Sequence, residues 1–171
     1  ISIKMIEHSV KEIQSTSSVF DQVEAMGHEQ VVFCHDKEIG LKAIIALHDT
    51  TLGPAMGGTR MWHYTNESEA LTDVLRLSRG MTFKNAVAGL NIGGGKAVII
   101  ANPEMDKTTN FLHAYAEVVD SLKGKYIAAE DVGSTIHDIE IISEKTPYVA
   151  ALPVEGSSGD PSRFTARGVY W

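Results

Sequence analysis

The 171-residue chain has 15 Lys and Arg against 22 Asp and Glu, a formal net charge of -7, and 43% hydrophobic residues. This length and composition suit one globular domain with a sizeable core, and the acidic balance argues against a nucleic-acid partner. Since no apolar stretch approaches the roughly 20 residues of a membrane span and the first residues lack a signal peptide's apolar run, we expect a cytoplasmic protein that binds small molecules or proteins.

The N-terminal third predicts a helix followed by a β-hairpin. Residues 18–26 suit a helix that Gly27 ends as a C-cap. Two apolar, β-branched runs follow at 29–35 and 41–49, joined by a polar turn, so we expect an antiparallel pair of strands. The single cysteine, Cys34, lies in the first run, where a buried and unreactive thiol is favoured over a reactive one.

The rest of the chain alternates between helical and strand patterns. The elements expected are a helix that begins at Asn66 and Glu69 and runs toward Lys84, a strand at 97–101, a helix at 108–122, a strand at 126–129, a helix capped by Thr135 and Asp138, a strand at 148–152, and a last helix entered through Asp160 and Pro161. Such alternation predicts a single α/β domain. Its sheet would be mixed but mostly parallel, with the antiparallel hairpin at one edge and helices packed on both faces.

Nucleotide and metal sites are not predicted by the local motifs. The run Gly93-Gly94-Gly95-Lys96 fails as a phosphate-binding loop because Leu90 and Ala97 stand where a glycine and a Ser or Thr are needed. It fails as a dinucleotide fingerprint because Val98 replaces the third glycine. The seven histidines show no i, i+4 pairs and no cysteine partners, so no metal is expected.

Two groups of glycines have two possible roles. Gly57 and Gly58, and the run 93–95, can form tight turns, or they can bring the main chain close to a small ligand. Chain position alone favours the turns.

Two lysines occupy positions that are predicted to face the core. Lys84 lies on the apolar helix face shared with Leu77 and Met81, and Lys96 stands at the entry of a strand predicted to be buried. Lysine is almost never fully buried without a partner. For either lysine alone, a side chain that extends to the surface is the favoured interpretation.

Asp131 changes this balance. It follows the strand at 126–129, and ligands of open α/β sheets collect at the carboxyl ends of strands. If both lysines reach the same crevice, one cation can hold a substrate carboxylate. The other, with its pKa lowered by burial and by its like-charged neighbour, can act in acid/base chemistry, and Asp131 can move protons to or from an amine.

Five segments resemble the Glu/Leu/Phe/Val dehydrogenase family, and most closely its leucine dehydrogenases. They are 48–62 (HDTTLGPAMGGTRMW), 79–86 (RGMTFKNA), 89–100 (GLNIGGGKAVII), 129–133 (AEDVG) and 156–162 (GSSGDPS). The resemblance runs from about residue 27 to residue 170. Gly95 departs from it, since leucine dehydrogenases usually have alanine there, and this leaves the preferred substrate side chain open between branched-chain and aromatic.

The resemblance implies a role for each matching residue. Lys84 resembles the lysine that binds the substrate α-carboxylate, Lys96 the catalytic lysine that activates the attacking water, and Asp131 the aspartate that handles the amino-group proton. Gly57, Gly58 and Met81 would line the substrate site, Met56 and Ala129 would lie against the substrate side chain, and Thr165 would approach the nicotinamide. The reaction implied is reversible oxidative deamination, in which an L-amino acid, NAD and water give a 2-oxo acid, ammonium and NADH.

The resemblance also implies a domain organisation. Residues 27–155 would form the substrate-binding and oligomerisation domain of a homo-oligomer, a dimer or larger. Residues 1–26 would be an N-terminal extension, and 156–171 the start of a connection to a Rossmann domain that this chain lacks. We therefore expect a truncated dehydrogenase that is inactive alone. The alternative is a free-standing, non-catalytic amino-acid-binding or oligomerisation module.

Overall fold

A computed structural model describes residues 18–153, 166–167 and 170. The elements, in chain order, are α2 (Val19–Met26), β1 (Gln30–Asp36), β2 (Leu41–Asp49), β3 (Ala55–Trp62), α3 (Glu67–Val87), β4 (Gly93–Ile100), α4 (Thr109–Ser121), β5 (Tyr126–Glu130) and α5 (Ile136–Ser143). Of the helix expected after Asp160, only residues 166–167 and 170 are described, and these are helical. None of the described helices is long and apolar enough to cross a membrane.

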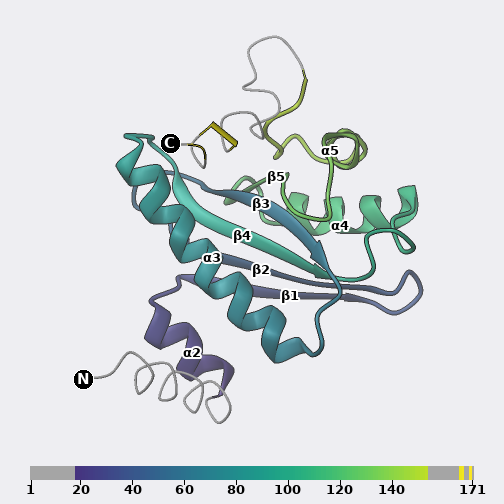
Figure 1. Cartoon of the computed structure of the whole chain (residues 1–171), viewed down its shortest axis with the longest axis horizontal. Helices are drawn as coiled ribbons and strands as arrows, with labels where there is room; N and C mark the ends of the chain where they lie inside the picture. The colour runs from purple at the N-terminus through teal and green to yellow at the C-terminus, as the bar shows by residue number, and fades with distance from the viewer. Residues whose placement is uncertain (1–17, 154–165, 168–169, 171) are drawn as a thin grey trace.

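The five strands form one sheet in the order β1-β2-β4-β3-β5 (Figure 1). β2 runs antiparallel to both of its neighbours, β1 and β4, whereas β3 is parallel to β4 and to β5. Four strands therefore share one direction. The predicted mixed, mostly parallel sheet with an antiparallel hairpin at its edge is confirmed.

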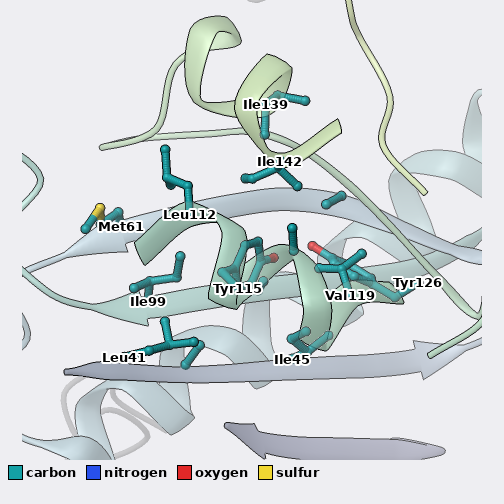
Figure 2. Close-up of a cluster of buried hydrophobic side chains, with 14 of the residues drawn as sticks. Leu41, Ile45, Met61, Ile99, Leu112, Tyr115, Val119, Tyr126, Ile139 and Ile142 are labelled. Atoms are coloured by element: carbon teal, nitrogen blue, oxygen red, sulfur yellow. The ribbon is translucent and has the colours of Figure 1, made fainter. Parts of the chain in front are cut away.

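Helices cover both faces of the sheet, as predicted. Because side chains alternate along a strand, Ile45 and Ile99 face α4 and α5, where they join the core around Tyr115 shown in Figure 2. Ile44 and Val98 face the other way and pack against α3. Cys34 lies beside the first of these clusters, and burial raises the pKa of its thiol to about 11, which agrees with the predicted unreactive cysteine.

The predicted helix ends are confirmed. Ser18, Asn66, Thr108 and Thr135 each accept a hydrogen bond from the backbone N–H three residues on, which satisfies a donor that the first turn leaves free. Gly27 ends α2 with a φ of 78°, in the left-handed region that glycine enters without steric cost.

Three expectations were wrong. Residues 55–62 form strand β3, so Gly57 and Gly58 do not make a tight turn. The run 93–95 begins strand β4, which places Lys96 inside the strand and not at its entry. Residues 148–152 form no full strand, because Val149 makes only an isolated bridge to Ala128.

Candidate active site

The candidate site lies on the part of the sheet that α3 leaves open. α3 packs mainly on β4 and β2. On the sheet face against which the helix packs, β3 and β5 lie to one side of it and are not covered by it (Figure 1). By strand alternation this face carries Gly58 and Ala129, and Asp131 follows directly after β5. Lys96 reaches the same place from β4, so three neighbouring parallel strands supply the site.

Lys96 and Asp131 form an ion pair in this position. The lysine Nζ lies 3.0 Å from the Asp131 Oδ2, and the two side chains are 6% and 24% exposed. Burial lowers the pKa of Lys96, and the charges of Arg60 and Lys84 lower it further, while Asp131 opposes the shift. A larger fraction of Lys96 is therefore neutral at a given pH than of an ordinary lysine, in the direction that the sequence analysis expected.

Lys84 differs from its prediction in one respect. It lies in the last turn of α3 and is exposed, so it does not face the core. Its charge nonetheless acts on Lys96. The exposed ammonium of Lys84, beside the buried amine of Lys96, can therefore contact an anionic ligand.

The end of α3 that carries Lys84 is held tightly against β4. The Asn85 Nδ2 is buried and donates a hydrogen bond of 2.7 Å to the Gly93 carbonyl. A Cβ at Gly94 would lie 2.0 Å from the Thr82 Oγ1 and 2.2 Å from the Thr82 backbone nitrogen. Only glycine permits this approach, which sets the position of Lys84 relative to Lys96.

Gly57 and Gly58 serve close packing inside β3. A Cβ at Gly57 would lie 1.7 Å from the Gly95 carbonyl oxygen. A Cβ at Gly58 would lie 2.7 Å from the Asp131 Cβ and 3.1 Å from the Lys96 Nζ. Gly58 therefore leaves the room in which Lys96 and Asp131 meet.

The other predicted site residues vary in how far the structure places them. Met56 and Ala129 are half-buried and alternate onto the open face with Gly58. Met81 is half-buried in α3. Thr165 lies outside the described residues.

Gly95 is turned away from the site. A Cβ there would meet the Tyr126 ring at 2.9 Å and the Ala55 Cβ at 3.1 Å, which lie in the core on the α4 side of the sheet.

The sequence did not single out Arg60 and Asp73. The Arg60 Nε donates to the Asp131 Oδ2 at 2.9 Å, and its Nη1 donates to the Asp73 Oδ2 at 2.8 Å. Arg60 stands two residues after Gly58, and therefore on the same strand face. That spacing could have indicated it only if β3 had been predicted as a strand.

Comparison with known proteins places most of the chain in one family. Residues 28–148 match the model of the Glu/Leu/Phe/Val dehydrogenase dimerisation domain. The leucine dehydrogenase of Geobacillus stearothermophilus is 59% identical over 153 residues, which are 89% of this chain and 42% of that protein. An L-tryptophan dehydrogenase of Nostoc punctiforme is 56% identical over 152 residues, 89% of this chain and 42% of that protein.

Solved structures agree in fold. The crystal structure of the L-tryptophan dehydrogenase from Nostoc punctiforme superposes with a TM-score of 0.75 at 59% identity, over 77% of this chain and 39% of that one. A hetero-hexameric glutamate dehydrogenase from Thermus thermophilus reaches a TM-score of 0.67 at 20% identity, over 92% of this chain and 43% of that one; at that identity the likeness shows the fold alone. The chain thus spans about two fifths of the length of the relatives it matches.

Proposed function

Because the chain belongs to the Glu/Leu/Phe/Val dehydrogenase family, we propose that its residues 27–155 form the substrate-binding domain of an NAD-dependent L-amino-acid dehydrogenase. The reaction is the reversible oxidative deamination of a branched-chain or aromatic amino acid. The observation that carries the proposal is the pairing of the nearly buried Lys96 with Asp131 at 3.0 Å, next to the exposed Lys84. Two cations and a carboxylate around one small site suit a zwitterionic amino acid.

Lys84 holds the α-carboxylate of the substrate. Its ammonium is exposed and anchored on the last turn of α3, so an anion can approach it from solvent. Half-buried Met56 and Ala129 would contact the substrate side chain.

Lys96 and Asp131 carry out the proton transfers of the proposed reaction. Because burial lowers the pKa of Lys96, the neutral amine is more readily available to take a proton from the attacking water. Asp131 accepts hydrogen bonds through its Oδ2. The substrate amine can therefore approach the Oδ1 and exchange a proton there.

The described residues do not fit a nicotinamide dinucleotide. A dinucleotide site needs a glycine-rich turn between a strand and a helix, whereas the glycines at 93–95 lie inside β4. We therefore assign NAD no residue in this part of the chain. We expect the purified 171-residue protein to form no NADH from L-amino acids, since hydride transfer needs the nicotinamide held against the substrate.

We further propose that the domain works in a homo-oligomer. The matched family domain is described as a dimerisation domain.

The test compares Lys96→Ala with Lys84→Ala in the full-length protein, by steady-state kinetics of NADH formation from L-leucine, L-valine and L-tryptophan. Loss of a general base typically costs about 10²- to 10⁴-fold in rate, so Lys96→Ala should lower kcat by that amount. Loss of a charged hydrogen bond worth about 1.5–3 kcal/mol should raise KM by roughly 10- to 100-fold in Lys84→Ala.

Lys145→Ala is the matched control, because Lys145 is exposed and follows α5 on the other side of the sheet. It should leave both constants unchanged. Near-wild-type kcat in Lys96→Ala would contradict the proposal. NADH formation by the isolated chain would show that residues of this chain hold the cofactor.

A further inference from the structure

Arg60 links the two carboxylates that surround the candidate site. Its Nε lies 2.9 Å from the Asp131 Oδ2 and its Nη1 lies 2.8 Å from the Asp73 Oδ2. The Arg60 side chain is only 21% exposed. The planar guanidinium suits such a bridge, whereas a lysine ammonium has no fixed fork of donors.

Arg60 and Lys96 bind the same oxygen. Both cations contact the Asp131 Oδ2, at 2.9 and 3.0 Å. Arginine stays charged at every accessible pH, while Lys96 can lose its proton. The positive charge of Arg60 therefore always offsets part of the negative charge of Asp131. The attraction that Asp131 exerts on a protonated Lys96 is weaker as a result.

The charges of the linked side chains favour a neutral Lys96. Ion pairs connect three cations, Arg60, Arg76 and Lys96, to two carboxylates, Asp73 and Asp131. This network carries one excess positive charge when every member is ionised. Arg60 and Arg76 do not titrate, so loss of the Lys96 proton removes this excess. Of the two arginines, Arg60 is the one that contacts Asp131, the partner of Lys96.

The far end of the bridge is firmly held. Asp73 also accepts hydrogen bonds from the Tyr64 hydroxyl at 2.7 Å and from the Arg76 Nε at 2.8 Å. Burial alone would raise the pKa of Asp73, but these hydrogen bonds and that of Arg60 lower it. Asp73 thus stays ionised and fixes the guanidinium on α3.

We propose that Arg60 is a positioning residue that holds Asp131 in place and takes up part of its charge, so that Lys96 gives up its proton more easily. The catalytic meaning of this arrangement rests on the proposed role of Lys96 as a base. The ionisation of Lys96 itself does not depend on that role and can be measured directly.

The test follows the titration of Lys96 in the purified 171-residue chain. Competitive acetylation of amino groups from neutral to strongly alkaline pH, read by peptide mass spectrometry, gives the midpoint of the pH profile for each lysine. In Arg60→Gln the Lys96 midpoint should rise by about one pH unit, which leaves about tenfold less neutral amine at a fixed lower pH. Changes in access to the buried amine alter the plateau and leave the midpoint in place.

Arg76→Gln is the matched control. Arg76 also binds Asp73, but it is 59% exposed and does not contact Asp131, so its loss should move the Lys96 midpoint far less. An unchanged midpoint in a folded Arg60→Gln variant, or equal shifts in the two variants, would overturn the proposal.

Asp73→Asn provides the second variant if Arg60→Gln does not fold. It removes an anion from the network and keeps Arg60, so the Lys96 midpoint should move down; no shift would count against the proposal. The labelling requires no turnover. A failure of the proposed function, seen as an active Lys96→Ala enzyme, is therefore distinct from a failure of this inference.

Discussion

Gly58 controls the space at the centre of the site. A Cβ at this position would meet the Asp131 Cβ at 2.7 Å, the Glu130 carbonyl oxygen at 2.7 Å and the Lys96 Nζ at 3.1 Å. The two backbone-fixed contacts cannot move aside cheaply. Lys96 and Asp131 can therefore contact each other only because Gly58 in β3 has no side chain.

We predict that Gly58→Ala separates Lys96 from Asp131. Overpacking of this kind costs about 1–3 kcal/mol of unfolding free energy, while catalysis should fall by at least about 100-fold, since small misplacements of reacting groups have effects of that size. Urea unfolding and steady-state kinetics of the full-length protein measure the two effects.

Gly80→Ala is the control for this substitution. A Cβ at Gly80 meets nothing within 4 Å, and alanine in a helix interior is favoured over glycine by about 0.5–1 kcal/mol. This variant should be slightly more stable and equally active. An active Gly58→Ala enzyme with an unchanged pH profile would show that the close approach at Gly58 is not needed.

Single residues were predicted from the sequence when their chemistry was unusual for their position. Lys96 stands in an apolar strand and Asp131 at a strand end, and the structure pairs them. Arg60 was not predicted, because only its ion-pair partners, 13 and 71 residues away, mark it as part of the site. Such pairings appear only once the strand order is known.

At the scale of elements, α3 and β4 form the contact that sets the geometry of the site. The helix can approach the strand because Gly94 has no side chain under Thr82. His48 adds a hydrogen bond of 2.9 Å to the Thr82 Oγ1. The helix that bears Lys84 is thereby held against β4, which bears Lys96, and against the neighbouring strand β2.

Gly94→Ala should push α3 away from β4. The new Cβ would lie 2.0–2.6 Å from three atoms of Thr82, two of them backbone, so a side-chain rotation cannot relieve the clash. We expect a loss of about 3 kcal/mol or more of unfolding free energy, at the upper end of overpacking effects. Chemical denaturation at neutral pH measures it.

Thr82→Ala tests the cause of that loss. It removes the Oγ1 contact while leaving the backbone contacts, so the double variant should recover only a small part of the stability. If the double variant recovered the full unfolding free energy, the clash would involve only the Thr82 side chain, and the argument from the backbone contacts would be wrong.

The hairpin and the helix starts were predicted because they are formed by local interactions, and β4 and β5 because apolar runs indicated buried strands. The hairpin depends on one polar turn, and the helix starts depend on caps three residues apart. β3 was missed because its central glycines have low strand propensity. It is a strand because it pairs with β4 and β5, which come 38 and 71 residues later at the Ala55 register.

At the scale of the whole molecule, two hydrophobic clusters hold the layers together, and a histidine pair lies at the border of the second. His28 follows α2, hydrogen-bonds the Ser78 Oγ of α3 at 2.7 Å, and packs edge-on against His48 with 4.9 Å between ring centroids. Three parts of the chain, α2, α3 and β2, meet at this pair. Protonation here therefore bears on the stability of the entire fold.

Burial lowers the pKa of His28 to about 4, with the charges of His48 and Arg79 adding to the effect. An unfolded chain has an ordinary histidine with a pKa of about 6.5, so between these two values the unfolded state binds more protons than the folded state. Stability then rises with pH. The contribution of His28 is complete above the unfolded pKa and is lost as the pH falls from there toward 4.

We therefore predict that the unfolding free energy decreases between neutral pH and pH 4 and that His28→Gln flattens this decrease, because glutamine cannot take up the proton. Urea midpoints measured at several pH values across the interval provide the comparison. His137→Gln is the control, since the His137 side chain is 77% exposed on α5 and should leave the slope as it is. Equal slopes in wild type and His28→Gln would mean that the acid sensitivity of this fold arises elsewhere, while a steeper slope would reverse the sign argued here.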